Sequence, residues 1–317
     1  MLSEKVLIIY NPNSGRGCGE RLAQRLKKGL ERRGGQVAQI FRSNSCEIVY
    51  EFCRDNSGNP EQFTLAVIIG GDGTLSPWVD AMIKHRFSVP IYAFGRGTAN
   101  DFSAFLGTAR SIRRVCNIIT RNPSLREFDT LYINDLTYGI NVACGGAFTN
   151  GVTKYSKKGK RRFGKLAYMW KAAGMAFKMR SQPMKFTVDG TEHTAEVYLF
   201  LILNSPNAGS IRRISTTARP WDGELELVAI KRCGFFGKLG LGVRGLFRRL
   251  ENSPHVLKIS GKQFVVETVG EQNPNFTLTD IDGNKGEPYP MQVSVSDEKS
   301  LFITVDKHTK RMYNTCT

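Results

Sequence analysis

Residues 70–74 read Gly-Gly-Asp-Gly-Thr and so combine glycines with one carboxylate and one hydroxyl. They follow the apolar run Leu65–Ile69, which is typical of a buried parallel strand closed by glycine. Apolar residues then recur at helical spacing over residues 75–86, which places the glycines at a strand-to-helix turn. At such a turn the backbone can approach a ligand, and the first N–H groups of the helix face an anion. A tight turn that only needs glycine is the plainer explanation, but glycines on both sides of Asp72 favour phosphate binding, with Asp72 where phosphates and a metal would lie.

Three more polar loops are expected at the same edge of a sheet. Predicted strands alternate with helices in the first third of the chain, which favours a parallel α/β sheet, and ligands bind such sheets beyond the carboxyl ends of the strands. The strands Val6–Tyr10, Gln36–Phe41 and Val89–Phe94 each end in a polar loop. These loops supply Asn11, Pro12, Asn13, Ser14 and Gly15, then Ser43, and then Gly97, Thr98, Asn100 and Asp101.

Asn100 has two explanations that its spacing does not separate. It can cap the helix that is predicted to begin at Asp101, or it can hydrogen-bond a nucleotide. None of the predicted strand-to-loop turns carries GxxxxGK[ST] or GxGxxG, so the ordinary P-loop and dinucleotide-binding assignments lack their signal there.

Composition limits the class of protein and its partners. Lys and Arg number 45 against 28 Asp and Glu, and the net charge of +17 implies an anionic partner: nucleic acid, an anionic membrane or a phosphorylated substrate. A hydrophobic content of 41% excludes wholesale disorder. Seven cysteines without a CxxC pair and four scattered histidines indicate no zinc site. Unpatterned thiols and the lack of a signal peptide favour the cytoplasm, and the longest apolar run, Val197–Leu203, is too short to span a bilayer.

A second domain is predicted from a change of pattern around Pro123–Asp129. Short alternating strands follow, which favours an antiparallel sandwich, so we predict an α/β domain over residues 1–128 and a β-sandwich domain over residues 129–306. Turn signals separate many of the strands, and the later predicted strands include Asn275–Thr279, Met291–Val295 and Leu301–Val305. The turn signals include Asp189-Gly190, Asp222-Gly223 and Asp282-Gly283.

Two basic helical insertions interrupt the predicted strands. Lys154–Arg180 contains ten Lys or Arg and no acidic residue, and Lys231–Leu250 carries arginines beside an apolar stripe. Either the stripes pack on the sandwich with the charges in solvent, or the insertions dock on anionic lipid. No recognised nucleic-acid-binding motif is present. The second stripe comprises Leu239, Val243, Leu246, Phe247 and Leu250.

Three motifs together, Asn11–Gly15, Gly70–Thr74 and Gly97–Phe102, resemble those of the diacylglycerol kinase catalytic-domain family, which includes bacterial lipid kinases and the sphingosine and ceramide kinases. Later family motifs correspond to Asn204, Asp222-Gly223 and Asp282-Gly283, so the resemblance covers nearly the whole chain. It implies an α/β nucleotide domain followed by a β-sandwich domain that offers the lipid site, with the active site in the cleft between them. It also implies that residues 307–317 return to the first domain.

The resemblance further implies roles for individual residues. ATP would be held by the first loop, by Ser43 (or Ser45), by Gly70–Thr74 and by Thr98. Asp72 and Asp282 are the implied catalytic carboxylates, and Mg²⁺ is the implied metal. A structural magnesium would lie at Asp222, with Arg219 and Glu224 at neighbouring ligand positions.

Two departures from the family pattern bear on activity. Asn284 stands where the family usually has Glu, and an amide cannot take a proton from an alcohol near neutral pH. Trp221 stands where many members have an additional Asp before Asp-Gly, which weakens the case for the structural magnesium.

We therefore expect an ATP- and Mg²⁺-dependent lipid kinase, cytoplasmic and peripheral at the membrane. It would bind an anionic membrane surface through Lys154–Arg180 and Lys231–Leu250 and would have no nucleic-acid partner. A membrane-associated nucleotide-binding regulator with little kinase activity is the alternative that Asn284 favours, and an NAD kinase is a third. The lipid is not readable from the sequence, and the oligomeric state is open, with a homodimer as one alternative.

Overall fold

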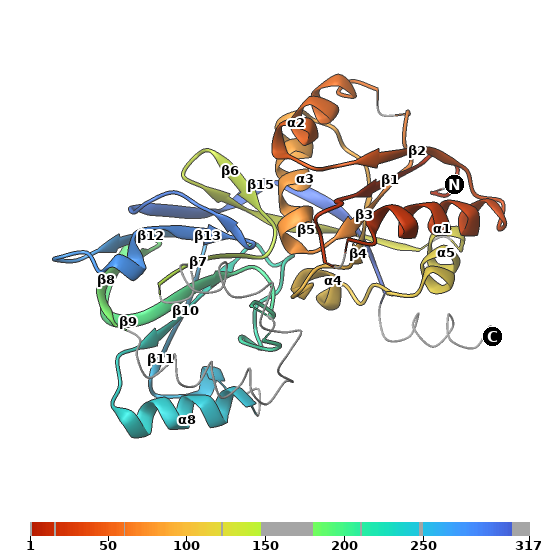
Figure 1. Cartoon of the computed structure of the whole chain (residues 1–317). Helices are drawn as coiled ribbons and strands as arrows, with labels where there is room; N and C mark the ends of the chain where they lie inside the picture. Colours follow the sequence, from red (N-terminus) through yellow and green to blue (C-terminus); the bar gives the residue numbers. More distant parts are fainter. Residues whose placement is uncertain are drawn as a thin grey trace. The chain divides into compact units, whose positions relative to one another are not determined.

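A computed structural model gives the fold of the chain (Figure 1). The structure describes residues 2–15, 17–59, 61–121, 123–146, 180–209, 211–246 and 250–305. By its internal contacts the chain divides into two compact units. The first contains residues up to Thr130, Tyr138–Ile140 and the chain from Ser296 onward, and the second contains Leu131–Thr137 and Asn141–Val295.

The first unit is built on a parallel sheet. Its strands are β1 (Val6–Tyr10), β2 (Val37–Arg42), β3 (Leu65–Gly70) and β4 (Ile91–Gly95), in the order β4-β3-β1-β2. Every residue of β1, β3 and β4 is buried, as expected for parallel strands that are covered on both faces, whereas the edge strand β2 is partly exposed.

Helices cover both faces of this sheet. One face carries α2 (Cys46–Asp55), α3 (Asp72–Lys84) and α4 (Asp101–Phe105), and the other carries α1 (Gly19–Glu31) and α5 (Ile112–Thr120), which lie side by side in Figure 1. The leucines of α1 recur at intervals of four residues, so a single stripe of the helix is buried. The sequence analysis did not predict α5, although Val115, Cys116, Ile118 and Ile119 of this helix are buried.

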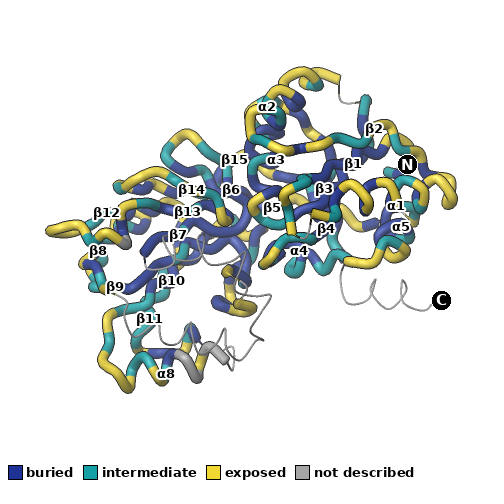
Figure 2. The backbone as a smooth tube through the Cα atoms, in the orientation of Figure 1, coloured by how far each residue is buried: buried dark blue, intermediate teal, exposed yellow. Residues whose placement is uncertain are grey.

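The second unit is an antiparallel structure. Its strands pair in the order β14-β13-β7-β9-β8-β12-β15, with β10 between β9 and β11. Apolar side chains from most of these strands meet in one core, and Figure 2 colours the buried residues of the chain dark blue. The strands are β7 (Val142–Gly146), β8 (Gln182–Val188), β9 (Thr191–Leu203), β10 (Leu225–Lys231), β11 (Val256–Gly261), β12 (Gln263–Thr268), β13 (Thr279–Ile281), β14 (Asn284–Lys285) and β15 (Met291–Thr304). Two further strands, β5 (Ser124–Ile133) and β6 (Thr137–Gly139), pair with each other and have most of their residues in the first unit.

The long strand β15 contributes to both units. Its beginning pairs with β12 in the second unit, whereas Phe302 pairs with Ile91 of β4 in the first. The sequence analysis predicted two separate strands here because residues 296–300 are polar. Residues 296–300 continue the strand because two residues of β5 bind them. The ammonium group of Lys299 contacts the buried carboxylate of Asp129, and the Thr130 hydroxyl donates a hydrogen bond to the Glu298 carbonyl.

Other differences from the expected elements are local. The predicted strand Asn275–Thr279 is wrong, because residues 274–276 form the 3₁₀ helix η2 (Pro274–Phe276) and β13 begins only at Thr279. A second 3₁₀ helix, η1, spans Leu250–Asn252. The predicted domain end at residue 306 differs from the contact division, which assigns the chain from Ser296 onward to the first unit.

Parts of the expected organisation lie outside the described residues. They include residues 307–317 and, apart from Arg180, the basic insertion Lys154–Arg180. The second insertion contains α8 (Phe235–Leu246). Two side chains of its predicted apolar stripe differ in burial: Leu239, on α8, is exposed, whereas Leu250, the first residue of η1, is buried. Val243, Leu246 and Phe247 lie outside the described side chains. Within the described part of the chain, no helix is long and apolar enough to cross a membrane.

The predicted turns at Asp189-Gly190 and Asp282-Gly283 are confirmed. Asp189 and Gly190 have φ of 47° and 83°, and Asp282 and Gly283 have φ of 53° and 87°, the positive values that a two-residue type I′ hairpin turn requires. The Asp189 carboxylate also accepts hydrogen bonds from the backbone N–H groups of Lys262 and Gln263, which joins this turn to the connection between β11 and β12.

These hydrogen bonds predict that the Asp189 side chain stabilises the fold more than the Asp135 side chain, which lies in another turn at positive φ. Asp189→Ala and Asp135→Ala both place alanine at positive φ, but only Asp189 carries side-chain hydrogen bonds in the described structure. We expect Asp189→Ala to lower the free energy of unfolding by about 1–2 kcal/mol more than Asp135→Ala does. Urea unfolding followed by circular dichroism measures both, and equal losses would contradict the assigned role of the carboxylate.

Candidate active site

Two of the predicted loops meet backbone to backbone in the first unit. A Cβ atom added to Gly71 would lie 2.8 Å from the Cα atom of Gly97, and one added to Gly97 would collide with the Cα atom of Gly71. The Gly70 carbonyl accepts hydrogen bonds from the N–H groups of Arg96 at 2.6 Å and Gly97 at 3.2 Å. Only glycine fits at both contact positions, so the glycines that follow β3 and β4 serve close packing as well as turning.

The loop that follows β1 lies against the same pair. Gly15 has φ of +60°, and a Cβ atom there would collide with the Arg96 carbonyl oxygen. Asn11 stabilises this loop because its side-chain oxygen accepts a hydrogen bond from the Asn13 N–H at 2.8 Å. The structure therefore brings together three of the four loops that the sequence placed at one edge.

Asp72, the first residue of α3, ties the two glycine loops together. Its carboxylate oxygens accept hydrogen bonds from the N–H groups of Asp101 at 2.9 Å and Phe102 at 3.1 Å, so Asp72 caps α4 from a different loop. Burial raises the pKa of the Asp72 carboxyl, and the two N–H groups oppose that rise. Each oxygen keeps a second lone pair, so the carboxylate can still accept another hydrogen bond or contact a metal.

Asn100 has a partner that neither sequence explanation named. The residue is buried at φ of 54°, its side-chain oxygen accepts from the Gly97 N–H at 2.6 Å, and its side-chain nitrogen donates to the Gly97 carbonyl at 2.8 Å. It occupies the residue before α4, but its side chain makes no capping bond, because Asp72 caps that helix. The nucleotide-binding role of Asn100 stays a prediction. In the structure its side chain holds Gly97 in place through these two hydrogen bonds.

The other predicted nucleotide residues differ in exposure. Gly73 and Thr98 are exposed, whereas Thr74 is buried with its side chain against Gly70. Ser43 is also buried: its hydroxyl oxygen accepts a hydrogen bond from the indole N–H of Trp78 at 3.1 Å, and its N–H donates to the Tyr10 carbonyl. The nucleotide-binding roles of these residues stay predictions.

The arrangement of the three loops fits a bound phosphate. The helix α3 is 13 residues long, and the partial positive charge at its start favours an anion. The Thr74 N–H of its first turn already donates to the Gly71 carbonyl at 2.9 Å, so the Gly73 N–H is the one available to an anion. Glycine backbone lines the same place, which leaves the approach free of side chains. The triphosphate of ATP matches this chemistry, and Asp72 is the carboxylate next to it.

In the second unit, Asp282 has a structural partner of its own. Its buried carboxylate accepts hydrogen bonds through one oxygen from the N–H groups of Asn141 at 3.0 Å and Val142 at 2.9 Å. The Asp282 N–H in turn donates to the Val142 carbonyl. The hairpin turn is thus fixed to the start of β7, and the catalytic role of Asp282 stays a prediction beside this observed one.

Asp280 is a titratable group that the sequence analysis missed. It lies opposite Cys144 in the pairing of β13 with β7, and burial raises its pKa to about 6. Burial of the Cys144 thiol raises its pKa, and the nearby charges of Asp280 and Asp282 raise it further. Asn284 pairs with Ile281 instead and is half-buried.

The predicted metal ligands do not form a metal site by themselves. Asp222 and Glu224 are exposed, and the Glu224 N–H donates to the Asp222 carboxylate. The Arg219 carbonyl already accepts hydrogen bonds from the N–H groups of Trp221 and Asp222. Among the described residues, no group of three or more His, Cys, Asp or Glu is arranged to hold a metal ion.

Comparisons with known proteins give a consistent result. The family model described as the diacylglycerol kinase catalytic domain matches residues 5–133, and the model described as the YegS C-terminal NAD kinase beta sandwich-like domain matches residues 144–300. A diacylglycerol kinase of Bacillus subtilis is 26% identical over 289 residues, which cover 90% of this chain and 92% of the relative. A diacylglycerol kinase of Staphylococcus carnosus is 26% identical over 231 residues, covering 73% of this chain and 74% of the relative.

Solved structures share the fold. One from Bacillus anthracis str. Sterne has a TM-score of 0.78 at 20% identity and covers 98% of this chain and 97% of its own. A second, described as a diacylglycerol kinase from the same organism, has a TM-score of 0.71 at 19% identity and covers 96% and 98%. These similarities support the α/β domain followed by a β-sandwich domain that the sequence predicted.

The contact between Gly71 and Gly97 predicts that adding one methyl group at Gly97 will weaken nucleotide binding. Gly97→Ala must push the two loops apart, because the added Cβ atom meets backbone rather than a flexible side chain. We expect ATP binding, measured with a fluorescent ATP analogue, to weaken at least roughly tenfold. Gly240→Ala is the matched control, since a Cβ atom there meets nothing within 4 Å. Undiminished binding by Gly97→Ala would separate this contact from the nucleotide site.

The raised pKa of Asp280 predicts a pH-dependent stability. Its folded pKa of about 6 lies above the ordinary value of 3.8, so the folded state holds the proton more tightly. The protonated Asp280 carboxyl contributes its full stabilisation of the folded state below pH 4, and this contribution to the free energy of unfolding is lost as pH rises through 6. Asp280→Asn should therefore raise the free energy of unfolding by up to about 2 kcal/mol at pH 7.5 and have little effect at pH 4. Urea unfolding at both pH values tests this, with the exposed Asp297→Asn as control.

Proposed function

Because the chain belongs to the diacylglycerol kinase catalytic-domain family, we propose that it is an ATP-dependent lipid kinase that transfers a phosphoryl group to a hydroxyl of a membrane lipid. The observation that carries the proposal is the meeting of the Gly71 and Gly97 loops at the first turn of α3. The acceptor would be a diacylglycerol-like or sphingoid-like lipid. Free cysteines at every described cysteine position fit the reducing cytoplasm, where ATP is available.

The residues of the first unit would hold the nucleotide. The Gly73 N–H at the start of α3 would bind a phosphate oxygen, while Gly15, Gly71 and Gly97 keep the approach open. Bound Mg²⁺ supplies charge neutralisation for phosphoryl transfer, and Asp72 is the residue that would contact it. The hydrogen bonds from Asp101 and Phe102 fix the Asp72 carboxylate in one orientation, which spares the cost of ordering it when the nucleotide binds.

The acceptor hydroxyl needs positioning more than it needs a strong base. The transition state of phosphoryl transfer is loose, so a misplaced base costs less than misplaced phosphates. Asp282 is the proposed orienting carboxylate, held in place by the N–H groups of Asn141 and Val142. Asn284 can donate or accept a hydrogen bond but cannot take the proton.

A kinase assay tests the proposal directly. Radiolabelled ATP, Mg²⁺ and mixed lipid vesicles should give labelled lipid with the wild-type protein. Asp72→Ala should lower kcat/KM about 10²-fold or more, because it removes both the carboxylate and the cap that orders α4. Asp55→Ala, an exposed acidic residue of α2, should retain wild-type activity. Equal lipid labelling by wild type and Asp72→Ala would show that Asp72 is not catalytic.

Asn284 supports the second candidate, a nucleotide-binding regulatory protein with little kinase activity. If the missing carboxylate limits turnover, Asn284→Glu should raise kcat up to about 10²-fold while ATP binding stays the same. An unchanged kcat in a folded variant would remove this explanation. The description of the family model that matches residues 144–300 mentions NAD kinase, so the same assay should include NAD as an acceptor. Phosphorylation of NAD in place of lipid would overturn the lipid assignment.

A further inference from the structure

The start of α8 exposes a group of large apolar side chains. Phe235 is 63% exposed, Phe236 is 83% exposed and Leu239 is 52% exposed. The two phenylalanine rings contact each other edge to face with centroids 5.6 Å apart. Large apolar side chains gathered in this way on a surface mark a binding site more often than single ones do. The sequence analysis missed this group because it placed Leu239 in a stripe that excluded both phenylalanines.

The opposite side of α8 anchors the helix. Leu241 is buried, and a Cβ atom added to Gly237 would lie 2.7 Å from the Cys233 Cβ atom and 2.9 Å from the His255 Nε2 atom. The ammonium group of Lys238 lies 4.6 Å from the centre of the Tyr198 ring. These contacts set the orientation of the helix, so the Phe235 and Phe236 side chains project from a fixed support.

The segment that carries the exposed group is basic, and Glu196 of β9 is the acidic side chain paired with it. Residues 231–250 contain no acidic side chain, whereas Lys231, Arg232, Lys238 and Arg244 are basic. Arg232 pairs with Glu196 at 2.9 Å, and the Arg244 guanidinium donates to the Asn252 carbonyl. The surface beside the phenylalanines is therefore positive overall, and it complements a negative partner.

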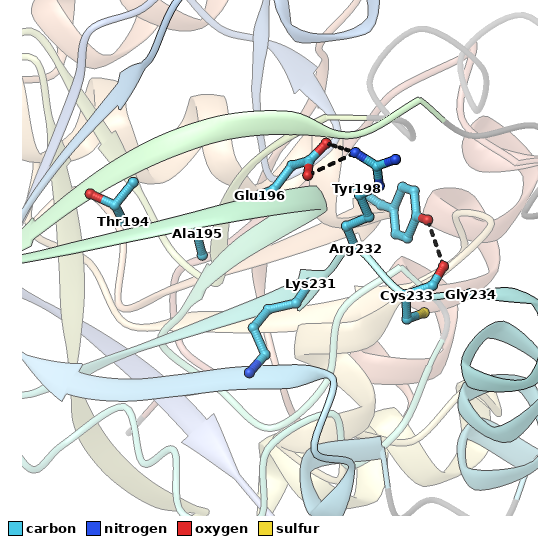
Figure 3. Close-up of a pocket in the computed structure, with 8 residues that line it drawn as sticks. All are labelled: Thr194, Ala195, Glu196, Tyr198, Lys231, Arg232, Cys233 and Gly234. Carbon is cyan, nitrogen blue, oxygen red and sulfur yellow. Dashed lines mark hydrogen bonds and ion pairs between the residues drawn. The ribbon is translucent and has the colours of Figure 1, made fainter.

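A cavity of about 730 Å³ lies at the base of α8 (Figure 3). Its walls include the Glu196–Arg232 ion pair and Tyr198, whose hydroxyl donates to the Cys233 carbonyl at 3.0 Å. Lys231 and Gly234, which directly precedes the phenylalanines, also line it. This pocket is open to solvent, and Gly234 joins it to the exposed phenylalanine rings.

We propose that Phe235, Phe236 and Leu239 form a membrane-docking surface for bilayers that contain anionic phospholipid, with Lys231 and its basic neighbours contacting the lipid phosphates. Aromatic and aliphatic side chains beside basic ones on a helix are the combination that binds at the membrane interface. Nucleic acid also explains the charge, and unpaired bases can stack on phenylalanine rings, but the aliphatic Leu239 beside them offers no stacking surface and favours the bilayer. The surface goes beyond the proposed kinase activity and does not depend on it.

Vesicle sedimentation without ATP tests the surface. The full chain should bind vesicles of phosphatidylcholine with one third phosphatidylglycerol and bind pure phosphatidylcholine vesicles weakly. Phe236→Ser should weaken binding to the mixed vesicles at least roughly tenfold. Leu239→Ser should also weaken it, whereas Leu136→Ser, at the same 52% exposure in the turn between β5 and β6, should not. Lys231→Gln should weaken it about fivefold, an effect that added salt removes.

Further variants and a competing ligand complete the test. Phe236→Trp keeps an interfacial aromatic ring and should retain binding, which separates loss of the ring from loss of the fold. Equal binding by wild type and Phe236→Ser would overturn the proposal. It would also be overturned if a DNA duplex bound more tightly than the mixed vesicles and Phe236→Ser left both affinities unchanged. Because no ATP is present, failure here leaves the proposed kinase activity standing, and an inactive kinase leaves the docking result intact.

Discussion

The hydrogen bonds from the N–H groups of Asp101 and Phe102 to the Asp72 carboxylate are the interaction on which the first unit's loop structure depends. One carboxylate begins α3 and caps α4, so it fixes two helix starts at once. These bonds hold the loops in the glycine contact between Gly71 and Gly97, together with the Gly70 carbonyl, which accepts from Arg96 and Gly97. Asn100 completes the arrangement by holding the Gly97 peptide from its other side. The cost is a desolvated carboxyl with a raised pKa, which only the surrounding N–H groups offset.

The meeting of the loops was predictable from sequence, but the partners within them were not. Parallel strands place their carboxyl ends at one edge, so the topology alone brings residues 11–15, 70–74 and 97–100 together. The bond of Asn100 to Gly97 and that of Ser43 to Trp78 depend on side-chain directions that spacing does not specify. Asp72 shows the limit most clearly, because its sequence neighbours suggest a ligand for phosphate or metal, whereas its nearest partners belong to a motif 29 residues away.

In the second unit the sequence predicted turns better than strand lengths. Asp-Gly pairs specify type I′ turns locally, so Asp189 and Asp282 were found. The polar residues in the middle of β15 looked like a loop because their partner, Asp129, is 170 residues earlier in the chain. Asp280 was missed for a related reason, because its burial depends on the pairing of β13 with β7, which is more than 130 residues earlier in the chain. Buried polar residues with distant partners account for most of what remained unpredicted.

The division of β15 between the two units restricts how such proteins can change in evolution. Phe302 and Ile303 are fully buried in the first unit, yet they are encoded after the whole of the second. A gene fragment that ends near residue 133, where the first family model ends, would lack those core residues of the first unit. Recombination that keeps this core must therefore inherit both ends of the gene together, whereas the segment between them can be exchanged as an insert.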